Sequence, residues 1–171
     1  GMAAGRSRRW DALLSPFLYI FYSIPKVVFL PVIIVVLGLG DFPKIFIIAI
    51  TVFFQIAIMV RDAAKAIPEE QVMTMRSLCG TKWQDFRHLI WPACLPGILT
   101  ALRTSLGIAL ALLFITETFA AFSGLGYFIM NRMEVRNYEE MYAAILTLAA
   151  IGIIAYMALD IAERKLCPWK K

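Results

Sequence analysis

The sequence predicts an all-α membrane protein with about four transmembrane helices, and three observations support this fold class. Hydrophobic residues make up 61% of the 171 residues, whereas soluble domains contain about 45–50% apolar residues. Charged residues make up only 17% of the chain, and they fall in clusters. Between the clusters lie runs that approach the roughly 20 apolar residues that a helix needs to cross a bilayer.

The first apolar run, residues 15–40, contains several prolines. The Ser-Pro pair at 15–16 is typical of a helix start, with serine as the N-cap and proline at the first helical position. Pro25 and Pro31 lie inside the run and predict a kinked or broken helix. Lys26 lies between them, so we expect part of this segment to lie at the membrane interface.

Three further runs each predict one membrane helix. Residues 42–60 follow a turn at 38–41 whose aspartate can cap the helix. Residues 97–122 and 142–163 are the other two apolar runs. The stretch between them, residues 123–141, is a polar loop with one short helical candidate. Because no repeat or low-complexity linker interrupts the chain, we predict a single domain over its whole length.

The distribution of lysine and arginine predicts the topology. Basic residues cluster at the N-terminal end, in residues 61–96 and in the C-terminal tail. Positively charged residues favour the cytoplasmic side, so all three parts are expected there. The turn at 38–41 and the loop at 123–141 then lie outside, which is consistent with four crossings.

Residues 61–96 separate two apolar runs and predict a cytoplasmic hairpin of two short helices. The first helix opens with two glutamates that suit its dipole, and Gly80 ends it. The sequence from Thr81 to Gln84 has the form of a capping box for the second helix, which we expect to end at Pro92. An apolar face of the first helix is formed by residues at helical spacing: Val72, Met75 and Cys79. One interpretation is that a partner protein binds this hairpin and displaces it. The other is that the hairpin is an amphipathic loop held at the lipid headgroups.

No pattern in the sequence indicates an enzyme, a metal site or a nucleic-acid interface. His88 is the single histidine, and the three cysteines have no metal-ligand spacing. The chain has no Gly-rich loop of the kind that holds the phosphates of ATP, and no nucleophile–base pair is evident. The basic residues form no stripe with interleaved aromatic residues, so nucleic acid is not an expected partner.

Polar side chains inside the predicted spans are candidates for a translocation path: Thr51, Gln55, Thr116 and Glu117. Ionisable groups in a membrane are costly and mark a path or a partner. For Glu117 a path or intersubunit role and a structural hydrogen bond both stay open. For the other three residues, hydrogen bonding between helices explains them equally well. We expect Arg103 to reach towards the membrane interface.

The stretch "MRSLCGTKWQDFRHLIWPACLPGILTALRTSLGIAL", residues 75–110, resembles the coupling region of ABC importer permeases. The pattern of that family is E-A-A, three residues, Gly, nine residues and I-x-L-P. Here Cys79 takes the glycine position, with Gly80 beside it. The triplet falls on Met73, Thr74 and Met75, so its acidic residue is absent. Glu117 with the following "SGLGYFI", and the C-terminal helix, are similar to the branch that imports nitrate, taurine and aliphatic sulfonates.

The resemblance implies a type I ABC importer permease core in a bacterial inner membrane. It implies that the hairpin docks on a separate ATPase through residues of its first helix and turn: Val72, Met73, Thr74, Met75, Leu78, Cys79, Gly80 and Thr81. ATP would bind to that ATPase, with no cofactor on this chain. The family usually carries two further membrane helices before the position of Arg6, so we expect this chain to lack them.

The resemblance also implies the remaining partners and the activity. An extracytoplasmic solute-binding protein and a second permease copy, in a homodimer surrounded by lipid, would complete the importer. A small anionic solute of the nitrate, sulfonate or taurine kind would cross by alternating access. The alternative is a non-transporting membrane scaffold whose loop at 61–96 lies at the interface.

Overall fold

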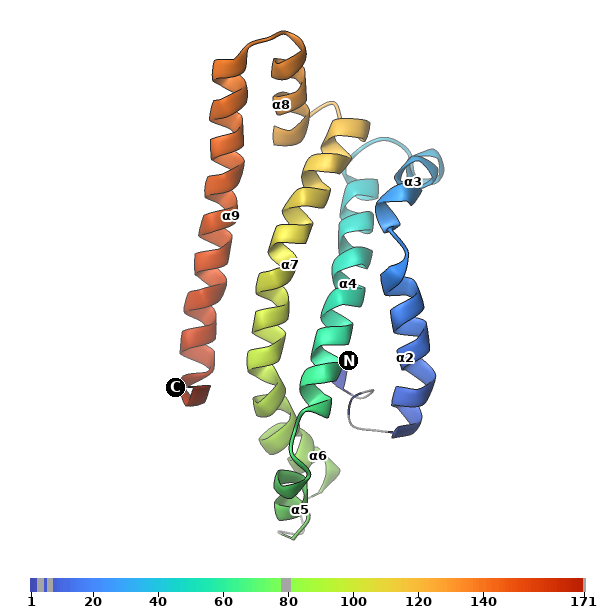
Figure 1. The fold of residues 1–171 in the computed structure, drawn as a ribbon, viewed down its shortest axis with the longest axis vertical. Coiled ribbons are helices and arrows are strands. Elements are labelled where there is room, and N and C mark those ends of the chain that lie inside the picture. The colour runs from blue at the N-terminus through green and yellow to red at the C-terminus, as the bar shows by residue number, and fades with distance from the viewer. Residues whose placement is uncertain (3–4, 6–7, 78–80, 171) are drawn as a thin grey trace. The chain divides into compact units, whose positions relative to one another are not determined.

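The computed structural model describes residues 1–2, 5, 8–77 and 81–170, and these residues form helices and turns without any strand (Figure 1). The prediction of an all-α fold is confirmed. The helices in chain order are α2 (Arg8–Ser23), the 3₁₀ turn η1 (Lys26–Phe29), α3 (Leu30–Leu37), α4 (Asp41–Lys65), α5 (Glu69–Ser77), α6 (Lys82–Asp85), the π-helical turn η2 (Phe86–Ile90), α7 (Trp91–Ala120), α8 (Leu125–Glu134), α9 (Tyr138–Leu166) and the 3₁₀ turn η3 (Pro168–Lys170).

Three helices in the described part of the chain are long and apolar enough to cross a membrane: Asp41–Lys65, Trp83–Phe119 and Tyr138–Leu166. A fourth crossing is available if α2 and the η1–α3 segment act as one span, although the two parts are bent by 68°. This bend confirms the predicted break in the first apolar run. Pro25 lies at the break with an extended backbone, at a ψ of 92°, because proline cannot donate the hydrogen bond that would continue the helix.

The predicted helix start at Ser15 and Pro16 is wrong. The helix α2 begins at Arg8 and continues through Pro16. The Ser15 hydroxyl donates a hydrogen bond of 2.7 Å to Asp11 Oδ1 instead of capping a helix. Asp11 is itself bonded to α4. These contacts fix the turn before the proline, so the helix needs only to forgo the one hydrogen bond that Pro16 cannot donate.

The predicted end of the second hairpin helix at Pro92 is also wrong, as is the predicted start of the next membrane helix at Gly97. Helical structure runs without a break from Trp83 to Phe119, over 37 residues. The π-helical turn η2 directly precedes Pro92. A π turn is wider than an α turn, so it relieves the clash between a proline ring and the carbonyl one turn earlier. Pro96 follows within α7.

The chain divides into two compact units that share its long helices. One unit contains residues 1–23, 54–103 and 159–171, and the other contains residues 24–53 and 104–158. The first unit, called the coupling unit below, holds α2, α5, α6, η2 and the adjoining parts of α4, α7 and α9. The second unit holds α3, α8 and the rest of the long helices.

Candidate functional site

The candidate site is the coupling segment, residues 69–90, at the start of the 37-residue helix. Its first helix, α5, opens with Glu69 and Glu70, whose charges suit the positive end of the helix dipole. Its second helix, α6, begins with the predicted capping box. The Thr81 N–H donates to Gln84 Oε1 at 2.8 Å, and the Gln84 N–H donates to Thr81 Oγ1 at 3.4 Å. The capping box is therefore confirmed.

The predicted docking residues divide between an inner and an outer face of α5. Val72 packs on the core of the coupling unit, and Met75 is half-buried. Met73 and Thr74 face outward, and Met73 is 61% exposed. Thr81 is exposed at the start of α6. Leu78, Cys79 and Gly80 lie outside the described residues. Of the predicted docking residues on α5, Met73 and Thr74 therefore form the outward surface that is available to a partner.

A small apolar core holds the coupling segment against the long helices. Its fully buried members are Ala64 at the end of α4, Ile67 in the loop that follows, and Cys94 on α7. Val72 from α5, with Leu89 and Ile90 from η2, packs on these residues. Burial of such side chains from water stabilises the arrangement by about 1.5–3 kcal/mol for each large residue. The segment is therefore packed on α4 and α7, and a force applied to it would reach both helices.

Three aromatic rings line the helix that leads from the segment into α7. The rings of Trp83 and Phe86 are stacked, with centroids 5.8 Å apart. The ring of Trp91 follows, 6.3 Å from that of Phe86. Both indoles are exposed. Contacts between aromatic rings at these separations stabilise their arrangement beyond simple burial, so they stiffen the helix across the π turn.

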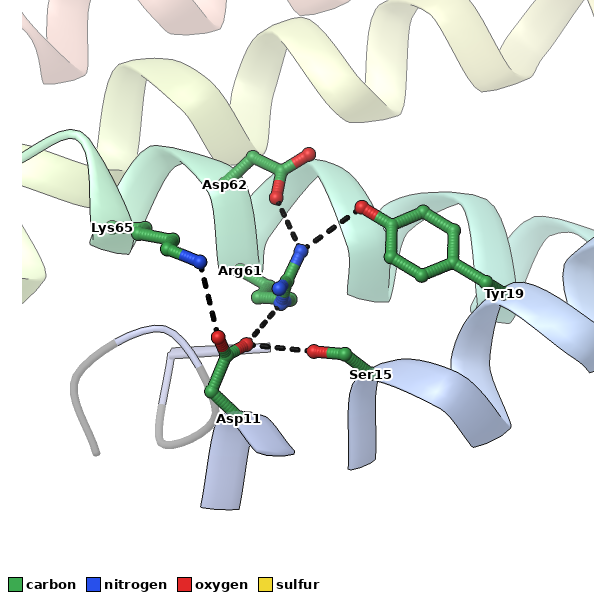
Figure 2. A network of polar contacts seen from close by, with 6 residues as sticks. All are labelled: Asp11, Ser15, Tyr19, Arg61, Asp62 and Lys65. Atoms are coloured by element: carbon green, nitrogen blue, oxygen red, sulfur yellow. Dashed lines mark hydrogen bonds and ion pairs between the residues drawn. The ribbon is translucent and has the colours of Figure 1, made fainter. Parts of the chain in front are cut away.

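A network of charged side chains joins α2 to the end of α4, next to the coupling segment (Figure 2). Arg61 is buried and donates from Nε to Asp11 Oδ1 at 2.5 Å and from Nη1 to Tyr19 Oη at 3.0 Å. Lys65 Nζ lies 3.1 Å from Asp11 Oδ2, and Asp62 pairs with Arg61 at 2.8 Å. Breaking a buried pair by removing one partner is strongly destabilising. The network therefore fixes α2 on α4 in one register.

Sequence reasoning missed this network, because its two halves lie 50 residues apart. Asp11 is the first acidic residue of the chain and follows several arginines, and Arg61 and Asp62 directly follow the apolar run at 42–60. The available signals were the Asp11 carboxylate, which lies among cations, and the Arg61 guanidinium, which lies at the end of the next predicted helix. Neither signal identifies a partner without the topology.

Arg103 on α7 is paired with carboxylates of α9, and the expectation that it reaches towards the membrane interface stays a prediction. Arg103 on α7 makes ion pairs with Glu163 and Asp160 on α9, and the distance from Arg103 Nη2 to Asp160 Oδ1 is 3.2 Å. Glu163 is buried. The two carboxylates are three residues apart and so share one face of α9. These two carboxylates compensate the charge of the guanidinium within the protein.

Glu117 makes the structural hydrogen bond that the sequence left open. Its carboxylate is buried and accepts the N–H of Gly126, at the start of α8, at 2.7 Å. Gly124 has a φ of 113°, which favours glycine. A Cβ atom at Gly124 would also overlap the Glu117 carboxylate. The loop "SGLG" is therefore shaped around this carboxylate.

The structure locates the other three candidates for the translocation path, but it does not show a path that connects them. Thr51 and Thr116 each donate to a carbonyl of their own helix, Ile47 O at 2.7 Å and Leu113 O at 3.0 Å. Gln55 Oε1 is buried without a hydrogen-bond partner in the described part of the chain. A translocation path through these residues stays a prediction. Within the same residues, no group of three or more metal-ligating side chains comes together.

Comparisons with known proteins agree with this architecture. Residues 1–168 match the sequence profile of a family described as "Binding-protein-dependent transport system inner membrane component". The taurine transport system permease protein TauC of Escherichia coli K12 is 28% identical over 169 residues, which cover 99% of this chain and 62% of TauC. SsuC of Bacillus subtilis 168, named for the transport of aliphatic sulfonates, is 30% identical over 171 residues, which cover 99% of this chain and 62% of SsuC.

This chain therefore spans about 62% of the length of these two relatives. Among solved structures, a chain of the MetNI methionine ABC transporter in an inward-facing conformation superposes with a TM-score of 0.79. The sequences are 23% identical, and the match covers 94% of this chain and 77% of that chain. The likeness shows that the two chains share a fold.

Proposed function

Since this chain belongs to the family of binding-protein-dependent transport system inner membrane components, we propose that it forms part of the membrane path of an ATP-driven importer. Its fold is that of a type I ABC importer permease, and it is a multi-pass inner-membrane protein, as the sequence predicted. In the proposed cycle a separate ATPase binds ATP and docks on the coupling segment. Its movement shifts the helices between inward-open and outward-open states, which is a population shift between two conformations.

One observation carries the proposal: the capped second helix of the coupling segment, α6, opens a helical stretch that runs without a break through η2 into α7. A displacement of α6 would therefore be transmitted along α7 instead of being lost in a flexible loop. The core around Ala64 and Cys94 also ties the segment to α4. These features support a rigid lever between a cytoplasmic partner and the membrane.

The proposed partners complete this importer. We propose a cytoplasmic ATPase, an extracytoplasmic solute-binding protein and a second permease copy, all embedded in or adjoining the lipid bilayer. We propose a small anionic solute, which is supported by relatives named for taurine and for aliphatic sulfonates. Uptake of taurine into proteoliposomes that contain the complete importer should require ATP inside the vesicle, and uptake without ATP would contradict the proposal.

The exposed side chain of Met73 provides the sharpest test of ATPase docking. Full burial of a methionine stabilises by about 1.5–3 kcal/mol, so burial of the 61% that is exposed would contribute about 1–2 kcal/mol. In the variant Met73→Asp, this contribution is lost and a carboxylate is desolvated, which costs several kcal/mol more. We therefore expect the affinity of the ATPase that co-purifies with the permease to fall more than tenfold.

Met133→Asp is a matched control, because Met133 is also exposed but lies on α8, in the loop predicted to be extracytoplasmic. This control should bind the ATPase as the unmodified permease does. Full ATPase affinity in Met73→Asp would refute docking at the coupling segment. If no ATPase co-purifies at all, the alternative of a membrane scaffold with an interfacial loop is favoured.

A further inference from the structure

A groove of about 480 Å³ lies beside the coupling segment, within the coupling unit. Its walls come from four elements, of which three lie close together in the sequence and the fourth, η3, lies at the C-terminal end. Gln71 belongs to α5, His88 to η2, Pro92 and Pro96 to α7, and Trp169 to the C-terminal turn η3. The groove therefore brings the end of the chain next to the proposed docking surface.

Trp169 is held at the rim of the groove by the residues that precede it. Cys167 is buried, and its N–H donates to Glu163 O at 2.9 Å. Glu163 in turn pairs with Arg103 on α7. Despite this anchoring, the Trp169 side chain remains 55% exposed. An exposed indole on a fixed backbone is a typical anchor for a partner, because its burial gives a large contact area with little loss of conformational freedom.

The chemistry of the groove favours a protein over a lipid surface. Gln71 and His88 add exposed polar groups to a lining that is otherwise apolar, a mixture that suits a protein side chain with polar neighbours. On one side, α5 begins with the exposed acids Glu69 and Glu70. On the other side, α9 ends with the basic residues Arg164 and Lys165. An anionic membrane would be repelled by the acidic side, whereas a protein surface of mixed charge can complement both sides.

We propose that this groove is a second contact for the ATPase subunit, with Trp169 as its anchor. The inference rests on the proposed function, because it extends the docking surface of the same ATPase from α5 to the end of α9. The occupant would be an apolar side chain of the ATPase, seated between Trp169 and the prolines of α7 and flanked by charges opposite to those on the two rims. The ATPase would then move α7 and α9 together, since Arg103 and Glu163 already join these helices.

The test compares Trp169→Ala with Trp10→Ala in the whole permease, embedded in lipid nanodiscs. Trp10 on α2 is 56% exposed and so matches Trp169 in residue type and exposure. We expect Trp169→Ala to weaken binding of the co-purifying ATPase at least tenfold, as is common for a tryptophan at the centre of an interface. Trp10→Ala should change the affinity less than twofold. The variant Trp169→Phe should retain most of the affinity, which shows that the aromatic side chain matters and that the variant folds.

A second measurement follows Trp169 directly, in a permease whose other three tryptophans are replaced by phenylalanine. We expect addition of the ATPase to shield the Trp169 fluorescence from quenching by iodide. If brominated lipids quench Trp169 and the ATPase has no effect, the groove faces headgroups and the inference is overturned. If Met73→Asp weakens ATPase binding and Trp169→Ala does not, the groove is not a contact while the proposed function stands. If neither variant weakens binding, both proposals fail.

Discussion

The ion pairs between α7 and α9 give an asymmetric prediction for two substitutions. Arg103 pairs with both Glu163 and Asp160, with side-chain exposures of 19%, 9% and 30% respectively. Asp160 also pairs with Arg164 at 2.9 Å. The variant Arg103→Met removes the charge that offsets the buried Glu163 carboxylate. The variant Glu163→Gln leaves Arg103 its second carboxylate, so the two changes should not be equivalent.

Removing one partner of a buried pair destabilises a protein by about 3–5 kcal/mol. Because these side chains remain partly exposed to solvent, we expect the destabilisation by Arg103→Met to lie near the lower end of this range, at about 3 kcal/mol. Glu163→Gln loses one charge-assisted hydrogen bond and should cost about 1–2 kcal/mol. The double variant should be more stable than Arg103→Met alone, because it no longer contains a buried Glu163 carboxylate that has lost its Arg103 partner.

The free energy of unfolding of each variant, measured in mixed detergent micelles with increasing denaturing detergent, provides the assay. A conservative change on the exposed face of α9, Ile153→Leu, serves as the control and should leave stability unchanged. Two results would refute the claim that Arg103 is shared between Glu163 and Asp160. One is that Arg103→Met is no more destabilising than Glu163→Gln, and the other is that the double variant is the least stable of the three.

Two further predictions concern the other buried charges. Gly124→Ala should destabilise the permease by about 2 kcal/mol or more, because alanine is strained at a positive φ and its Cβ would crowd the Glu117 carboxylate. The control for the same unfolding measurement is Gly107→Ala, because an added Cβ meets open space there. Asp11→Asn should lower the free energy of unfolding through the loss of its charge-assisted bond to Arg61, and an unchanged free energy of unfolding would show that this network does not fix α2.

The parts of the fold that depend on local signals could be predicted from the sequence. Pro25 removes a donor within an apolar run, and the structure bends there. Thr81 and Gln84 are three residues apart, and they form the capping box that this spacing indicates. In each case the physical cause lies within one or two helical turns, so no knowledge of distant residues was needed.

Predictions failed where distant contacts outweighed a local signal. The Ser-Pro pair at 15–16 is a good helix start in isolation, but the bond from Arg61 to Asp11 extends the helix before it. Pro92 is a good helix end in isolation, but the preceding π turn accommodates it. The partner of Arg103 on α9, Glu163, lies 60 residues away, so the sequence does not reveal this ion pair. The division of α5 into an inner and an outer face is not visible in the sequence, because Val72 packs on a core that includes residues of α4 and α7.

The altered coupling triplet now has a physical interpretation. In the resembling family the first position of the triplet is acidic, and here Met73 occupies it. The structure places this methionine on the outer face of α5, where an acidic residue would also meet a partner. A methionine adapts its shape to irregular apolar surfaces, so the loss of one polar contact need not weaken docking. We therefore expect the partner to present an apolar pocket to Met73 instead of a cation. We expect the charged contacts to lie at the two rims of the groove, formed by the start of α5 and the end of α9.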